Sequence, residues 1–362
     1  MTTVTQPPWE QSCREELTLL RPILAQQGYV LDDKQVHLGG ERSVISNRKM
    51  VLLGKHIPDQ RRVVIKTSRN SDGQGELKRE KACREVLNHM RFARDVFLSP
   101  ELLLWQEKDG FVIAITAFLD QTVSFLERPF REQFFLAMKA FETQEGAHAT
   151  TFEHGRMIRG IFQVFDPETY VRNFAHFQQT IREDLPEEST IHHHMERAQQ
   201  RLMKERLRLK QYAGFLTHGD FVPHNIRVVG HDIYLLDHSD MRFGNKYDGW
   251  ARFLNFMLLY HRELETACVQ YVKDNRAPEE REALELMRLY RLGELISYYA
   301  QRCQKSSENL QRLDRLRVSF WGDVLGALLQ QEPLSEARIE TYRKQRDVWR
   351  SPEEHERQKG LH

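Results

Sequence analysis

Apolar residues near the start of the chain recur at the intervals of a helix. Spacings of three and four residues put one set of side chains on a single helical face. The set consists of Leu17, Leu20, Ile23 and Leu24. The pattern predicts a helix over residues 10–27, in which Pro22 can introduce a kink. We assign residues 1–29 to an N-terminal helical extension and expect this helix to act as a lid or an oligomer contact.

From residue 30 onward, short apolar runs bounded by glycine, proline and aspartate replace the helical pattern. Runs of this length and composition are typical of β-strands. They occupy residues 36–38, 50–53, 63–65, 102–105 and 111–117. One apolar stripe at helical spacing, in residues 76–93, interrupts them. We therefore expect residues 30–120 to form a small lobe that contains a five-stranded antiparallel sheet and one helix.

The remainder of the chain has a mainly helical pattern of apolar residues. Prolines and the acidic turn of residues 183–188 break this pattern into separate helices. We expect residues 121–345 to form a larger, mostly helical lobe and residues 346–362 to form a charged tail. The predicted fold class is therefore α+β, with two lobes of unequal size.

The size and composition of the chain support two folded lobes. With 362 residues, of which 40% are hydrophobic and 29% charged, the chain exceeds a single typical core and has the composition of a folded protein. Its 53 basic and 52 acidic residues leave a net charge of +1, so no overall field attracts nucleic acid or an anionic membrane. We expect neither as a partner, and the oligomeric state stays open.

The expected location follows from the cysteines and from the lack of a long apolar segment. The cysteines are far apart and form no C-x-x-C pair, which favours neither a disulfide framework nor a zinc site. The first residues lack the pattern of a signal peptide, and no apolar run reaches the roughly 18 residues that suggest a membrane span. We therefore expect a cytoplasmic protein without a membrane span.

The most informative residues are His218, Gly219 and Asp220, which are followed by Asn225 and then by Asp237. A His-Gly-Asp turn by itself is typical of an ordinary loop. The flanking apolar runs and the second aspartate, which follows an apolar pair, make the combined pattern specific. With these residues the chain resembles the aminoglycoside phosphotransferase and choline kinase superfamily, which is related to the protein kinases. The resemblance implies a protein-kinase-like fold and Mg-dependent transfer of a nucleotide γ-phosphoryl group to a hydroxyl group.

The resemblance gives each motif residue a role that suits its chemistry. Asp220 is the expected catalytic residue, placed to accept the proton of the acceptor hydroxyl. Asn225 and Asp237 offer the hard oxygen ligands that Mg prefers. His218 is expected to anchor the loop backbone. Asp248 is expected to brace the catalytic loop, although it also suits the N-cap of a helix.

Two residues near the expected metal aspartate receive no definite role from the resemblance. Asp240 is either a second metal ligand or a solvated carboxylate. His238 departs from the superfamily pattern, because many relatives carry tryptophan or another bulky residue at this position. The departure bears on the subfamily and leaves the core motif intact.

The small lobe supplies the expected nucleotide-binding residues. Lys66 ends an apolar strand run, whose neighbours would keep its stem buried and aim its ammonium group at the nucleotide phosphates. A carboxylate in the following helix should hold this lysine. Glu80 is the predicted partner of Lys66, and Glu85 is the alternative.

Two further segments should contact the nucleotide. The phosphate-covering loop is expected at Gly39, Gly40 and Ser43, with Ser46 as an alternative hydroxyl, because glycine permits close backbone approach and serine can hydrogen-bond a phosphate oxygen. The base should pack between the lobes beside the linker. The linker consists of Phe118, Leu119 and Asp120. Whether the base is that of ATP or GTP stays open.

The expected function is that of a small-molecule kinase whose acceptor is an alcohol, such as an aminoglycoside, an amino alcohol or a sugar. A nucleotide-binding pseudokinase scaffold and a protein Ser/Thr kinase are the alternatives. A protein kinase ordinarily carries an activation segment after the metal aspartate, and residues 238–247 are too few to provide one before Asp248. The pseudokinase alternative is disfavoured because Lys66, Asp220 and both expected metal ligands are present.

Overall fold

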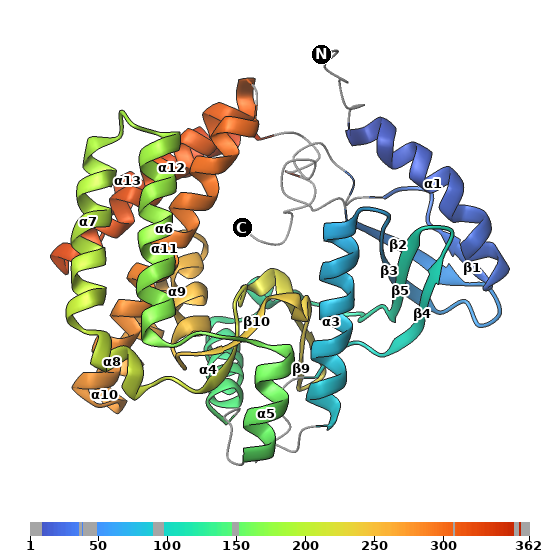
Figure 1. Ribbon diagram of the computed structural model, residues 1–362, viewed down its shortest axis with the longest axis horizontal. Coiled ribbons are helices and arrows are strands. Elements are labelled where there is room, and N and C mark those ends of the chain that lie inside the picture. The colour runs from blue at the N-terminus through green and yellow to red at the C-terminus, as the bar shows by residue number, and fades with distance from the viewer. Residues whose placement is uncertain are drawn as a thin grey trace.

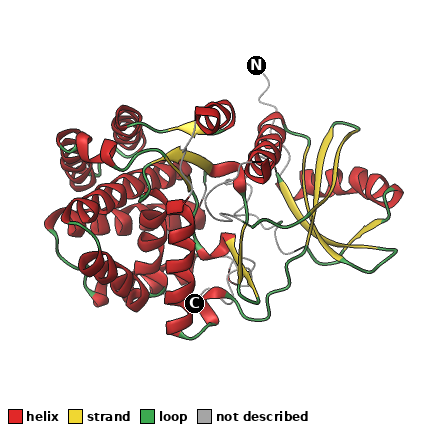
Figure 2. Ribbon diagram, turned by 90° about the horizontal axis from the view of Figure 1, so that it is seen from below, coloured by secondary structure: helices red, strands yellow, loops and turns green. Residues whose placement is uncertain are grey.

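The chain folds into a small lobe built on a sheet and a larger helical lobe, as Figure 1 shows. The computed structural model describes residues 9–35, 38, 49–89, 98–146, 152–306, 308–350 and 355. Figure 2 shows the strands of the main sheet grouped at one end of the molecule and most of the helices at the other. The predicted α+β fold with two unequal lobes is therefore confirmed.

The sheet of the small lobe has five strands, and every neighbouring pair is antiparallel. The strands are β1 (Tyr29–Leu31), β2 (Met50–His56), β3 (Arg62–Ser68), β4 (Leu102–Lys108) and β5 (Phe111–Ala117). Their spatial order is β1-β2-β3-β5-β4. Four of them contain the predicted runs. Consecutive side chains of a strand point to opposite faces, so Val63 and Ile65 lie on one face of β3 and Lys66 on the other.

The first strand is not the one that the sequence predicted. Tyr29–Leu31 forms β1, directly after Gly28, whose φ of 78° lets the chain turn out of the preceding helix. Of the run expected at residues 36–38, Val36 and His37 lie outside the described residues, and Leu38 is not in a strand. The prediction was wrong because β1 has only three residues and thus no recognisable alternation.

Helix α1 (Trp9–Gln26) covers one face of the sheet (Figure 1). Its buried residues Leu20, Ile23 and Leu24 share one apolar cluster with Ile65 and Ile113 of the strands. The apolar stripe that predicted this helix is thus buried within the small lobe. The helix is therefore a layer of the small lobe, and the interpretation as a lid or an oligomer contact is wrong for its apolar face.

Helix α3 (Ser71–His89) lies between the sheet and the large lobe (Figure 1). Its residues Leu77 and Cys83 are fully buried. Cys83 belongs to an apolar cluster with Leu216 and Met241, which both come from the large lobe. Helix α3 therefore packs against both lobes and lies next to the segment that carries Asp237.

The large lobe is a bundle of helices around a long central one, α11 (Pro278–Lys305), which is buried over most of its length. The other helices are α4 (Phe130–Gly146), α5 (Phe152–Ile161), α6 (Pro167–Asp184), α7 (Ser189–Lys204), α8 (Arg206–Gln211), α9 (Asp248–Tyr260), α10 (Arg262–Asn275), α12 (Glu308–Gln330) and α13 (Glu336–Trp349). Among the described helices, none combines the length and apolar content that crossing a membrane requires.

Short strands at the edge of the large lobe carry the motif residues. β6 (Gln163–Val164), β10 (Met241–Gly244) and β7 (Phe215–His218) form a three-stranded sheet in that order, and β8 (Ile226–Val229) pairs with β9 (Asp232–Leu235) as a hairpin. The hairpin pairs Ile226 with Leu235. It therefore brings the residues that precede β8 next to those that follow β9.

Candidate active site

His218 links the backbone near Asp220 to the backbone near Asp237. This residue ends β7 and is fully buried. Its ring nitrogen Nε2 lies 2.8 Å from the carbonyl oxygen of Leu236, and the backbone N–H of Asp220 donates to Nδ1 at 3.2 Å. Because Nδ1 accepts, Nε2 carries the proton and donates to Leu236. The imidazole therefore fixes the backbone of Asp220 relative to the residue that precedes Asp237.

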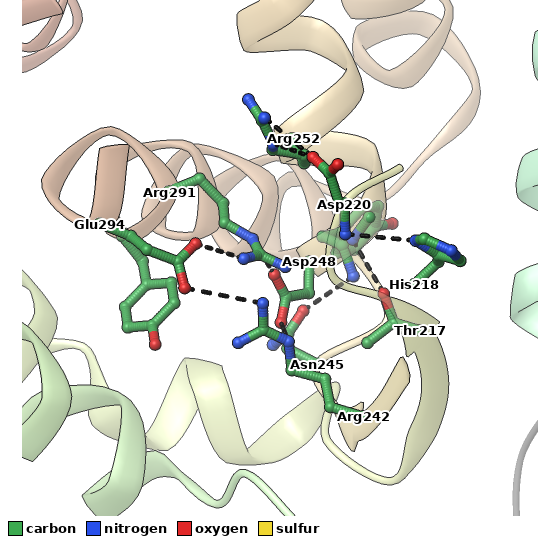
Figure 3. A network of polar contacts seen from close by, with 12 residues as sticks. Thr217, His218, Asp220, Arg242, Asn245, Asp248, Arg252, Arg291 and Glu294 are labelled. Carbon is green, nitrogen blue, oxygen red and sulfur yellow. Dashed lines mark hydrogen bonds and ion pairs between the residues drawn. The ribbon is translucent and has the colours of Figure 1, made fainter. Parts of the chain in front are cut away.

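Both carboxylate oxygens of Asp220 have partners, and Figure 3 shows the contact with Arg252. Oδ1 accepts from Nε and Nη2 of Arg252 at 3.1 and 2.9 Å, and Oδ2 accepts from Nδ2 of Asn225 at 2.9 Å. Partial removal from water would raise the pKa of Asp220, but the positive charge of Arg252 outweighs it and lowers this pKa. The side chain is 43% exposed, so it remains accessible.

Asn225 and Asp237 meet at the open end of the β8–β9 hairpin. The backbone N–H of Leu236 donates to the carbonyl oxygen of Asn225 at 2.8 Å. The amide nitrogen Nδ2 of Asn225 also donates to the carbonyl oxygen of Asp220 at 2.9 Å, so the nitrogen and not the oxygen of this amide faces Asp220. An amide oxygen and a carboxylate of this kind are chemically suited to a Mg ion.

Asp237 stands at the centre of a cluster of charges. Its φ of 58° is in the left-handed region, which is uncommon for a residue other than glycine. Oδ1 lies 3.6 Å from Nζ of Lys66 and 3.5 Å from Nζ of Lys49, and it accepts from Oγ of Ser239 at 3.1 Å. Burial would raise the pKa of Asp237, but Lys66 and then Lys49 outweigh it and hold this pKa far below its usual value.

Lys66 is paired with Glu80. Its Nζ donates to both carboxylate oxygens of Glu80 at 2.8 Å. Burial would lower the pKa of Lys66, but Glu80 and then Asp237 raise it above its usual value, so the ammonium group stays charged. Glu85, the alternative partner, lies 2.6 Å from Lys81 instead. The structure thus selects Glu80.

Asp248 belongs to a buried network under the loop that carries Asp220, which is the expected catalytic loop (Figure 3). It is the first residue of α9, whose N-cap is Tyr247, and it is fully buried. Its carboxylate accepts from the hydroxyl of Tyr170 at 2.9 Å, pairs with Arg291, and lies 3.5 Å from Nε of Arg242. The residue is therefore held by side chains from three other elements and does not cap the helix.

Gly219 marks the point where this network meets the catalytic loop. Its N–H donates to the carbonyl oxygen of Asp240 at 2.9 Å. A Cβ at this position would lie 2.4 Å from Oδ2 of Asp240 and 2.6 Å from Nη2 of Arg242. The glycine thus lets the loop approach both side chains. Asp240 is solvent-exposed at this place, and both roles considered for it stay predictions.

The remaining predicted nucleotide contacts lie at the small lobe. Gly39, Gly40 and Ser43 are outside the described residues. The linker of Phe118, Leu119 and Asp120 follows β5 directly, and the guanidinium of Arg62 lies 3.8 Å from the centre of the Phe118 ring. A cavity of about 390 Å³ adjoins Lys66 and Glu80, bounded by α3, β4, β5 and residues 98–102. The linker residues do not line this cavity.

Solved structures of antibiotic phosphotransferases share this architecture. No family model and no curated protein matches the sequence. A thermostable mutant of aminoglycoside phosphotransferase APH(4)-Ia, in a ternary complex with AMP-PNP and hygromycin B, is 15% identical with a TM-score of 0.58, over 86% of this chain and 98% of that one. Macrolide 2'-phosphotransferase type I is 13% identical with a TM-score of 0.57, over 88% and 99%. The complex of gentamicin with APH(2")-IIa is 15% identical with a TM-score of 0.51, over 81% and 90%.

The chain has the fold of the antibiotic phosphotransferases.

Within this phosphotransferase fold, sequence reasoning missed three charged residues of the site. Arg252 contacts Asp220, and Lys49 and Glu76 belong to the cluster around Asp237. None of them is part of the motif. Glu76 lies one helical turn before Glu80, a spacing that places both carboxylates on the same face of α3, and this was the one available signal.

His238 occupies the position after Asp237 without a polar contact of its ring. It is 1% exposed, and neither of its ring nitrogens has a hydrogen-bond partner among the described residues. Burial holds the pKa of His238 well below its usual value, so the ring is neutral. The imidazole therefore fills buried space without forming a hydrogen bond to the described residues.

Proposed function

We propose that this protein is a small-molecule kinase, which transfers the γ-phosphoryl group of ATP or GTP to a hydroxyl group of its acceptor and depends on Mg. One observation carries the proposal: the Lys66–Glu80 pair, Asp237 and the Asp220 loop converge between the two lobes. This convergence occurs in a fold shared with phosphotransferases whose structures contain ADP or AMP-PNP.

The donor nucleotide would be held by residues of both lobes. Lys66, fixed by Glu80, offers a charged ammonium group to the phosphates. Asn225 and Asp237 would hold the metal, together with phosphate oxygens, because amide and carboxylate oxygens are the hard ligands that Mg prefers. A bound Mg ion would neutralise the charge that develops on the phosphates during transfer.

On the acceptor side, Asp220 would position the hydroxyl group and accept its proton. Phosphoryl transfer requires positioning and charge stabilisation more than covalent chemistry. A carboxylate beside a γ-phosphate is repelled by it, and Arg252 offsets part of that negative charge at a distance of 2.9 Å from Oδ1. Asn225 fixes the other oxygen. The carboxylate therefore has one defined orientation.

A small molecule is the acceptor that the geometry favours. Residues 238–247 form only the short helical turn His238–Asp240, the strand β10 and a brief connection to α9. This leaves no room for the activation segment of a protein kinase. The structural neighbours are named for antibiotics, which are small molecules.

We also propose that the protein is located in the cytoplasm.

A pseudokinase scaffold is the second candidate, and nucleotide binding combined with the absence of turnover would favour it.

Isothermal titration of Mg-nucleotide, paired with steady-state rates, tests the proposed roles. Asp220→Asn should bind nucleotide like the wild type and lose turnover, whereas Asp237→Asn should lose both, because it removes a metal ligand. Normal turnover by Asp220→Asn would contradict the assignment of this loop as catalytic.

A further inference from the structure

A second lysine stands at the same carboxylate oxygen as Lys66. Lys49 immediately precedes β2, and its side chain is 10% exposed. Its Nζ forms an ion pair with Glu76 and lies 3.5 Å from Oδ1 of Asp237, while Nζ of Lys66 lies 3.6 Å from that oxygen. Two ammonium groups thus converge on the residue assigned to the metal.

Two glutamates of α3 hold the two lysines in the same way. Glu76 pairs with Lys49, and Glu80, one helical turn later, pairs with Lys66. The hydroxyl of Ser239 donates to Oδ1 of Asp237 at 3.1 Å and lies 3.3 Å from Oε1 of Glu76. Each lysine therefore has a carboxylate on α3 that fixes its ammonium group beside Asp237.

We propose that Lys49 is a second phosphate-binding lysine of the nucleotide site and that Glu76 is its positioning residue. The inference rests on the proposed function and extends it to residues outside the motif. A nucleoside triphosphate carries several negative charges, which one lysine neutralises only in part. Lys49 is mostly buried, approaches the same Asp237 oxygen as Lys66, and is held by its ion pair with Glu76. An anionic ligand bound at Lys66 would therefore meet a second ammonium group that is already positioned.

The arrangement also has a contrary interpretation, in which Lys49 competes with the metal for Asp237 and so opposes nucleotide binding. The two interpretations predict effects of opposite sign when the lysine is removed. A phosphate-binding lysine contributes affinity, whereas a competing lysine reduces it. The sign of the change in affinity therefore decides between them.

The test is the dissociation constant of ATP, measured without acceptor by isothermal titration, once with Mg and once with EDTA. Lys49→Ala should raise this constant about 10- to 100-fold in both conditions, the worth of a hydrogen bond between charged groups. Glu76→Gln should raise it less, because the ammonium group remains. Lys55→Ala is the matched control, since Lys55 lies on β2, the strand that Lys49 precedes, and is exposed, and it should bind like the wild type.

An unchanged or lower dissociation constant for Lys49→Ala would overturn the inference. If that variant does not fold, as judged by its thermal transition, Lys49→Arg and Lys49→Gln replace it: the arginine should retain most of the affinity and the glutamine should lose it, and equal affinities would overturn the inference. Absence of binding of both ATP and GTP by the wild type and by Lys55→Ala would contradict the proposed function itself, which separates the two failures.

Discussion

Arg252 donates two hydrogen bonds to a single oxygen of Asp220, from Nε at 3.1 Å and from Nη2 at 2.9 Å. The arginine lies on the second turn of α9, which begins at Asp248. Asp248 is itself fixed by a buried network. The orientation of the expected catalytic carboxylate thus depends on the placement of α9, and not on the catalytic loop alone.

Arg252→Ala should lower kcat about 10- to 100-fold, because charge-assisted hydrogen bonds that position Asp220 are lost. The KM for nucleotide should change little, since Arg252 contacts neither Lys66 nor Asp237 in the structure. Arg252 lowers the pKa of Asp220, so its removal should raise this pKa. The acid limb of the pH profile of kcat/KM should therefore move to higher pH.

Arg252→Lys is the control for this prediction, because lysine keeps the charge but not the two-nitrogen contact. It should recover part of kcat and keep the acid limb near that of the wild type. If Arg252→Ala retains full kcat with an unshifted acid limb, Arg252 does not position Asp220.

Lys66→Ala should raise the KM for nucleotide and leave the KM for the acceptor nearly unchanged. The ammonium group is fixed by Glu80 at 2.8 Å and faces Asp237, on the side where we propose that the nucleotide binds. Glu80→Gln should have the same effect in weaker form, because it removes the partner and keeps the lysine. Steady-state kinetics with each substrate varied in turn measure both constants. Equal increases in both would indicate a general loss of structure.

Asp248→Asn should reduce the free energy of unfolding by about 3 kcal/mol, the lower end of the cost of breaking a buried ion pair. The substitution leaves Arg291 and Arg242 buried with less compensating charge, since Glu294 and Asp240 are the carboxylates that still act on them. Urea denaturation measures the difference. Asp232→Asn, at an exposed position of β9, is the control and should change stability by no more than about 0.5 kcal/mol. Equal stability of both variants would show that the network is not needed for folding.

Removal of divalent cations should weaken nucleotide binding in the wild type far more than in Asp237→Asn, which has already lost the carboxylate ligand. The remaining affinity in EDTA should come from the lysines, because their ammonium groups need no metal to attract phosphates. Fluorescence titration of a nucleotide analogue with and without Mg provides the comparison. Identical Mg dependence in the two proteins would exclude Asp237 as a metal ligand.

Much of the fold could be predicted because four strands of the small lobe contain contiguous apolar runs. The run that ends at Lys66 and the one at Phe111–Ala117 pair directly in the sheet. β1 could not be predicted, because it has three residues and follows a helix directly. The position of α1 on the sheet could not be predicted either, since an apolar stripe shows that a helix is covered but not by which surface.

The motif residues of the site could be predicted because they are close in sequence and the β8–β9 hairpin keeps them together. The contacts of Arg252 and Lys49 could not. Arg252 is 32 residues from Asp220 and Lys49 is 188 residues from Asp237, and their meeting depends on how helices and lobes pack. A charged residue is usually solvated. No spacing in the sequence shows which charged residue instead contacts a distant carboxylate.

Acceptor-dependent turnover by the wild type and by Asp220→Asn tests the central claim most directly. A panel of aminoglycosides, macrolides, amino alcohols and sugars is assayed for consumption of ATP and GTP with Mg, and mass spectrometry detects an acceptor that has gained one phosphoryl group. The account predicts at least one phosphorylated acceptor, with a rate that falls about 10²- to 10⁴-fold in Asp220→Asn, the usual worth of a positioned acid–base group. A phosphorylated acceptor formed equally fast by Asp220→Asn, or nucleotide binding without turnover of any acceptor, would contradict it.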